Sequence, residues 1–250
     1  MFKGRTINIY VLIIIVFLVA VCAVFTIRQS LQATQIQKEL SEIKMLLSRP
    51  GALQQQPQQP PQVNIEGIEF EIGNNPILGK ESARLILVEF TDYQCPFCGR
   101  YARETFPQLR KQYVENGTIR YAVIDQPLPM HPEAAKAAEA SHCAQDQGKF
   151  WEIHEEMMGK QDDLKDLSSY AKTLNLNVGQ FEECLNTGKY SDVIRKDMEL
   201  ANKLGVNGVP GFIIGTVSRT DPRKVTGISM IRGAMPLGAF QQEIDSALKR

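Results

Sequence analysis

The stretch VEFTDYQCPFCGRY, residues 88–101, carries the pattern that decides the fold. Its first half ends the run RLILVEFTDY, whose short apolar and β-rich composition is typical of a strand buried on both faces. Cys95 and Cys98 follow directly, and Pro96 suits the first position of a helix, where a missing N–H costs nothing. A C-x-x-C pair can be a redox centre, half of a zinc site or a structural clip.

The position of the pair at a helix start favours redox chemistry. Unpaired backbone N–H groups and the positive end of the helix dipole stabilise a thiolate there, which lowers the pKa of Cys95 below the free value of about 8.5. A stabilised thiolate attacks disulfides and is also a good leaving group. Cys98, one turn further on, is expected to be more buried and to resolve a mixed disulfide. A zinc site needs two more ligands, and the best source of them is His142 beside Cys143.

The chain beyond the pair predicts an α/β domain. TIRYAVI (residues 118–124) has the composition of a second strand, and helical patterns fill most of residues 132–204. Two further strands, GFIIGTV and KVTGISMIRG, are expected to form a hairpin. Pro236 then opens a last helix.

Taken together, these features resemble the thioredoxin superfamily and, within it, the DsbA-like thiol–disulfide oxidoreductases. The resemblance rests on CPFC after a buried strand, on Glu89 six residues before Cys95, and on Pro210 in GVNGVPGF. It rests also on the helical block that contains HPEAAKAAEASHCAQDQGKFWEIHEEMM and on GAMPLGAF before the final helix. The resemblance implies a thioredoxin-like α/β fold with a helical insertion at about 126–205, between the second and third core strands.

The resemblance also assigns roles to site residues. Pro210 matches a cis-proline that packs against the redox cysteines, and the substrate backbone is expected to pair with Val209 as an added strand. Valine before this proline is typical of the oxidising branch, whereas the dipeptide Pro96-Phe97 does not settle the direction of transfer. Glu89 is either a buried carboxylate that handles protons for the pair or a strand residue that faces solvent.

The remaining cysteines and His131 each allow more than one interpretation. Cys143 and Cys184 fall on different predicted helices of the insertion and are expected to form a structural disulfide in an oxidising compartment. They could instead be buried free thiols or a second redox pair. His131, in the loop LPMHPEA, either lies near the pair and stabilises a thiolate or is a helix-start or surface residue.

Residues 7–25, INIYVLIIIVFLVAVCAVF, form an apolar run without charge, which predicts an uncleaved signal-anchor or transmembrane helix over residues 1–27. A cleaved signal peptide or lipidation of Cys22 are the alternatives. Lys3 and Arg5 precede the run, so the positive-inside rule places the main domain outside the cytoplasm, in the periplasm or an equivalent space.

Three further segments are predicted beyond the anchor. Residues 28–48 have an a/d seam about two heptads long, which indicates either a weakly dimerising coiled-coil stalk or a lone amphipathic helix at the membrane surface. Residues 49–63 are rich in proline and glutamine and form a linker. Residues 64–250 form the DsbA-like thioredoxin domain.

The balanced charge, with 28 basic and 28 acidic residues, gives no general attraction to nucleic acid. We therefore expect a membrane-anchored oxidoreductase that needs no cofactor or metal and donates the Cys95–Cys98 disulfide to reduced or unfolded secreted proteins. The resemblance implies reoxidation by a DsbB-like, quinone-linked membrane oxidase. The alternatives are a disulfide isomerase or reductase on the same fold, a peptide-binding chaperone module, and a metal-delivery protein.

Overall fold

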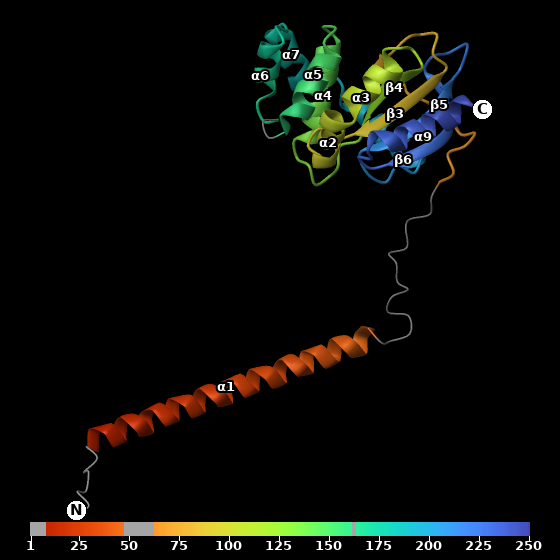
Figure 1. The fold of residues 1–250 in the computed structure, drawn as a ribbon. Helices are drawn as coiled ribbons and strands as arrows, with labels where there is room; N and C mark the ends of the chain where they lie inside the picture. The colour runs from red at the N-terminus through yellow and green to blue at the C-terminus, as the bar shows by residue number, and fades with distance from the viewer. Residues whose placement is uncertain (1–8, 48–62, 162–163) are drawn as a thin grey trace, which may run out of the picture. The chain divides into compact units, whose positions relative to one another are not determined.

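The computed structural model describes residues 9–47, 63–161 and 164–250 (Figure 1). The chain divides into two compact units, Met1–Pro61 and Gln62–Arg250.

The first unit contains one long helix, α1 (Ile9–Leu47), of 39 residues. It runs without a break through the segments predicted as an anchor and a stalk. Within the described residues, no helix combines the length and apolarity that crossing a bilayer requires, so the predicted transmembrane helix is not shown. Residues 1–8 of the predicted anchor and residues 49–62 of the predicted linker lie outside the described residues.

The second unit is built on a sheet in the order β1-β6-β5-β3-β4-β2. The central strand β3 pairs in parallel with β4 and antiparallel with β5, and β5 and β6 form the expected hairpin. Every residue of β3 is buried, which explains why its sequence has no alternation. The strands are β1 (Glu69–Glu71), β2 (Ile77–Leu78), β3 (Leu85–Thr91), β4 (Ile119–Asp125), β5 (Gly211–Val217) and β6 (Lys224–Arg232).

The helices confirm the mixed α/β fold, because five of them, α4–α8, separate β4 from β5 in the sequence. Figure 1 shows α4–α7 gathered on one side of the domain and the sheet with α9 on the other, with α2 between them. The helical segments are α2 (Pro96–Glu104), α3 (Phe106–Leu109), the π-helix η1 (Arg110–Val114), α4 (Ala134–Gln145), α5 (Phe150–Gly159), α6 (Leu167–Thr173), α7 (Val178–Asn186), α8 (Ser191–Lys203) and α9 (Leu237–Leu248).

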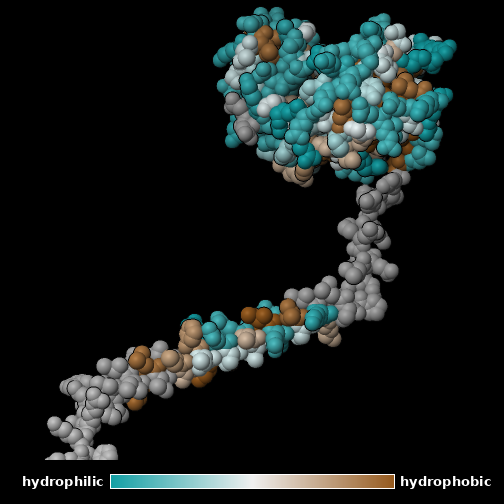
Figure 2. Space-filling view, viewed as in Figure 1, coloured by the Kyte–Doolittle hydropathy of each residue, from teal (hydrophilic) through white to brown (hydrophobic). Residues whose placement is uncertain are grey.

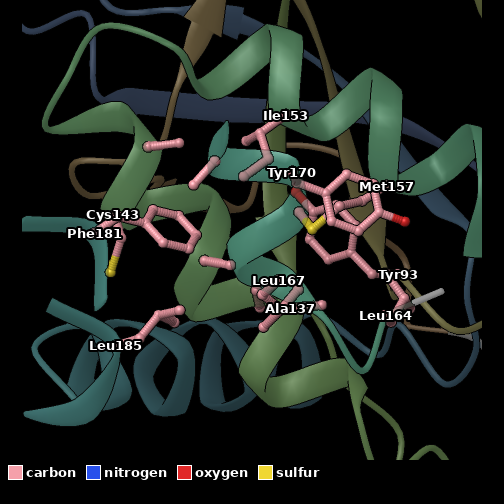
Figure 3. Close-up of a cluster of buried hydrophobic side chains, with 14 of the residues drawn as sticks. Tyr93, Ala137, Cys143, Ile153, Met157, Leu164, Leu167, Tyr170, Phe181 and Leu185 are labelled. Carbon is pink, nitrogen blue, oxygen red and sulfur yellow. The ribbon is translucent and has the colours of Figure 1, made fainter. Parts of the chain in front are cut away.

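Buried side chains form three apolar clusters. One lies on the face of the sheet covered by α2, α3 and α9, and a second involves the opposite face and α8. The third fills the helical insertion, where residues of α4, α5, α6 and α7 converge (Figure 3). Cys95 and Cys98 belong to this third cluster, so the cysteine pair lies where the insertion meets the sheet. The surface around these cores is mostly polar on the face seen in Figure 2.

Candidate active site

The cysteine pair begins helix α2, as the sequence predicts. Cys95 is the N-cap residue with an extended backbone (φ −74°, ψ 120°), and Pro96 is the first helical residue. Cys98 is fully buried, and the relative solvent exposure of Cys95 is 4%. Both are free thiols in this structure. Cys95, at the helix end, is therefore slightly more exposed than Cys98, which lies inside the domain.

The loop before β5 lies beside the end of β3, because Phe90 of β3 pairs with Gly211 of β5. The peptide bond between Val209 and Pro210 is cis. The Cys95 thiol donates to the Val209 carbonyl oxygen, with Sγ and oxygen 3.7 Å apart. Although 114 residues separate Cys95 from Val209, the fold brings the two predicted parts of the site into contact.

The two thiols differ strongly in acidity. A hydrogen bond from the Cys98 thiol, together with the backbone N–H groups of Cys98 and Phe97, lowers the pKa of Cys95 to about 6, against the effects of burial and of the charge on Asp92. Burial raises the pKa of Cys98 well above its usual value, and the neighbouring Cys95 and the charge of Glu89 raise it further. One thiol is therefore ready to ionise near neutral pH and the other retains its proton.

Glu89 lies inside the domain rather than facing solvent. Glu89 is 2% exposed, and the Tyr121 hydroxyl of β4 donates a hydrogen bond to Glu89 Oε2. Burial raises its pKa to about 7, despite this hydrogen bond. A carboxyl group with a pKa near neutrality can both donate and accept a proton under physiological conditions.

Asp92 is a site residue that the sequence analysis missed. Its side chain is fully buried, and Oδ1 accepts the backbone N–H groups of Gln94 at 2.7 Å and Cys95 at 3.1 Å. Oδ2 accepts the N–H of Leu128 at 2.7 Å and lies 2.8 Å from His131 Nδ1. An Asp three residues before a helix-opening cysteine is a recognisable turn signal, but the partners from the β4–α4 loop are not readable from the sequence.

Gln161, beyond α5, also contacts the pair and was not anticipated. Its Nε2 donates to the carbonyl oxygens of Tyr93 at 2.9 Å and Cys95 at 2.7 Å. Gly99 leaves room for this contact, because a Cβ at that position would lie 2.0 Å from Gln161 Oε1. The helical insertion is thereby fastened to the loop that carries the reactive thiol.

The structure joins Cys143 of α4 to Cys184 of α7 in a disulfide, across 41 residues of sequence. Cys143 is therefore not available as a metal ligand beside His142. The bond lies in the helical cluster of Figure 3, where Phe181 and Leu185 pack nearby. It links two helices of the insertion and has no part in the Cys95–Cys98 pair.

A second buried polar group lies at the end of β4. His142 Nε2 is 2.9 Å from Asp125 Oδ2, and Asn75 donates to Asp197 Oδ1 at 2.7 Å. Burial raises the pKa of Asp197 to about 7, while for His142 the hydrogen bond and charge of Asp125 outweigh burial and raise the pKa. Within the described residues, Asp125, His142 and Asp197 are the group whose ligand atoms, all within 4.8 Å of one another, could hold a metal ion.

Comparisons with known proteins agree with this fold. The family model described as Thioredoxin matches residues 71–231. A Na(+)/H(+) antiporter NhaA 3 of Salinispora tropica is 33% identical over 156 residues, which cover 61% of this chain and 23% of that protein. The Bacillus subtilis Disulfide bond formation protein D is 28% identical over 154 residues, covering 57% of this chain and 68% of that protein.

Among solved structures, Wolbachia pipientis alpha-DsbA1 is similar with a TM-score of 0.60 and 28% identity, covering 70% of this chain and 90% of that chain. The chain spans only about a quarter of the length of the antiporter named above. The DsbA-like neighbours support the expectation of an oxidoreductase enzyme. Because the family model extends over more than half of the sequence and includes the cysteine pair, β3 and Pro210, the chain belongs to the thioredoxin family.

Proposed function

We propose that this protein is an extracytoplasmic thiol–disulfide oxidoreductase that donates the Cys95–Cys98 disulfide to reduced substrate proteins. The observation that carries the proposal is the contrast in acidity within the pair: the pKa of Cys95 is lowered to about 6 and that of Cys98 is raised. A stabilised Cys95 thiolate favours the reduced form of the pair, and a disulfide whose reduced form is stabilised is an oxidant.

In the first step, a substrate thiolate attacks Cys95 Sγ of the disulfide. The bond between Cys95 and Cys98 breaks, a mixed disulfide forms at Cys95, and Cys98 leaves with the electron pair. Cys98 then takes up a proton, because its pKa is raised well above the usual value. Glu89 is buried near Cys98 and has a pKa of about 7, so it can supply this proton.

In the second step, another thiolate of the substrate attacks the substrate sulfur of the mixed disulfide. The new substrate disulfide forms and Cys95 leaves as a thiolate, which its low pKa favours. The substrate has then lost two electrons and the enzyme pair has gained them. The contact of Cys95 with the Val209 carbonyl supports binding of the substrate backbone beside Val209 and Pro210, as an added strand.

The cellular setting remains a prediction from the sequence. The apolar run at residues 7–25 supports a membrane anchor with the domain in the periplasm or an equivalent space. The Cys143–Cys184 bond supports an oxidising compartment, where disulfides persist. Reoxidation by a DsbB-like, quinone-linked membrane oxidase follows from the resemblance to DsbA-like proteins.

A disulfide isomerase or reductase is the second candidate, and one observation favours it. Leu31, Ile36 and Leu40 on α1 are more than half exposed, and Figure 2 shows apolar atoms among the polar ones along this helix. Ile36 and Leu40 lie on the predicted a/d seam, and pairing of two helices along it would give the dimer that suits isomerase action.

The deciding experiment compares oxidation of a reduced model protein with refolding of a scrambled one, using the full chain and its Cys95→Ala variant. The proposal expects stoichiometric oxidation by the disulfide form and none by the variant. In the same preparation, the redox equilibrium with glutathione should give a reduction potential of the Cys95–Cys98 pair of about −120 mV rather than about −270 mV. A protein that only reduces or only unscrambles its substrates would rule out the oxidase.

A further inference from the structure

The β4–α4 loop packs against the loop that carries the reactive thiol. Residues 128–131 form a turn closed by the His131 N–H, which donates to the Leu128 carbonyl at 2.9 Å. The turn presents the Leu128 N–H and His131 Nδ1 to the same oxygen of Asp92, at 2.7 and 2.8 Å. The Glu133 N–H donates to Gln94 Oε1 at 3.0 Å, one residue before Cys95.

Two anionic groups, the Asp92 carboxylate and the Cys95 thiolate, accept hydrogen bonds from N–H groups at the N-terminus of α2. Asp92 Oδ1 accepts the outermost N–H groups, those of Gln94 and Cys95, while the N–H groups of Phe97 and Cys98 stabilise the Cys95 thiolate. Like charges at one site oppose each other, so the Asp92 carboxylate works against ionisation of Cys95. Its effect on the thiol depends on how fully its own charge is compensated.

We propose that His131 is a positioning residue that compensates Asp92 through the Nδ1–Oδ2 hydrogen bond and so sets the acidity and oxidising power of the Cys95 thiol. The proposal rests on the redox function proposed above. His131 never touches the thiol and acts only through Asp92. The Asp92 side chain is 0% exposed, and that of His131 is 18% exposed.

The other groups around the thiol do not provide this compensation. Cys98 of α2 is the titratable group in contact with Cys95, and Glu89 of β3 acts on Cys98. The Val209 carbonyl, in the loop before β5, accepts from the Cys95 thiol, and the Gln161 amide, beyond α5, donates to the Cys95 carbonyl. Neither group titrates. Asp92 Oδ1 accepts the Cys95 N–H at 3.1 Å, and at this short range its negative charge raises the pKa of the Cys95 thiol.

The test measures the pKa of Cys95 from the pH dependence of its alkylation, in the full reduced chain. A Cys22→Ser background removes the exposed thiol of Cys22, which would also react. His131→Ala should raise the midpoint by about half a pH unit, because a nearby charge loses its partner. His131→Asn, which can place an N–H donor at a similar distance, should stay near the parent value. An Asn variant that matches the Ala variant would overturn the hydrogen-bond assignment.

A double-mutant cycle separates this effect from a general disturbance of the loop. Asp92→Asn should lower the midpoint, and adding His131→Ala in that background should change it by less than about 0.2 unit. An equal His131→Ala shift with and without the Asp92 carboxylate would refute the proposal. If Asp92→Asn fails to fold, the His131 variants alone remain decisive, because an unchanged Cys95 midpoint in His131→Ala also refutes it.

The redox equilibrium supplies a second readout. A midpoint half a unit higher means that the reduced thiolate is less stable, so the equilibrium constant with glutathione should move about threefold toward the protein disulfide. Both measurements use the pair alone and no substrate protein. Failure of the oxidase function would leave them unaffected, so the two proposals can fail separately.

Discussion

Replacing Glu89 with Gln should change how the stability of the domain depends on pH. In the unfolded chain this carboxyl loses its proton near 4.5, whereas burial raises its pKa in the folded domain to about 7. Between these values the folded state holds a proton that the unfolded state has released. Stability is therefore fully present below about pH 4.5 and falls as pH rises through about 7, by about 3 kcal/mol in all. A Gln side chain at position 89 keeps the size and shape of the Glu but has no proton to lose, so this pH dependence disappears.

The assay is equilibrium urea unfolding at about pH 5 and about pH 8, followed by fluorescence of Trp151, the single tryptophan of the chain. Its ring lies 6.1 Å from that of Tyr121, the hydrogen-bond partner of Glu89. Cys95→Ala and Cys98→Ala should be present in every sample, because the pKa of Cys95 is about 6 and would titrate in the same window. This background also avoids reductant and keeps the structural disulfide intact.

Between these two pH values the parent should lose about 2.5 kcal/mol more than Glu89→Gln. Asp197, with a pKa raised to about 7, contributes a similar slope to both proteins and cancels in the difference. Glu69→Gln, the same change at an exposed position of β1, serves as the control and should leave the slope unchanged. If the parent and Glu89→Gln curves run parallel within about 0.5 kcal/mol, a raised pKa for Glu89 is wrong.

Three other predictions concern stability. Replacing Cys143 and Cys184 together with Ser should cost about 4 kcal/mol in the chain-entropy model for a separation of 41 residues, and a loss below about 1 kcal/mol in urea unfolding would contradict it. Gly99→Ala should cost about 1 kcal/mol, because a Cβ there would displace the end of Gln161 from the Tyr93 and Cys95 carbonyls, and the same change should cost less in a Gln161→Ala background; an equal loss of melting temperature in both backgrounds would contradict this. Burial lowers the pKa of His154 to about 4, so lowering the pH from about 6.5 to about 4 should destabilise the parent relative to His154→Gln, and equal pH dependence of the two proteins in urea unfolding would count against this.

The sequence predicted those parts of the fold that depend on local pattern. The apolar run of β3, the helix start at Pro96 and the β5–β6 hairpin follow from composition and spacing, and the structure confirms them. The edge strands β1 and β2 were missed, because they have three and two residues and too little pattern to stand out.

The site was predictable only where it follows a motif. Cys95, Cys98 and Pro210 lie in recognisable stretches, but the partners of the reactive loop come from distant segments. Gln161 lies 66 residues from Cys95, and nothing in its surroundings marks it as a residue near the thiol. For His131 the sequence left open a role near the pair and a helix-start or surface position, and its contact is with Asp92, since tertiary packing decides which donor reaches which acceptor.

The order of the strands has a consequence for how the chain is made. β3 needs β5 as its neighbour, and the register pairs Leu85 with Thr216. At about 5–20 residues per second, synthesis from Thr91 to Val217 takes on the order of ten seconds. During that time the central strand is still an open edge, and its cysteines have no Pro210 loop beside them. The nascent chain is therefore most exposed to wrong thiol pairing before it becomes able to act on the thiols of others.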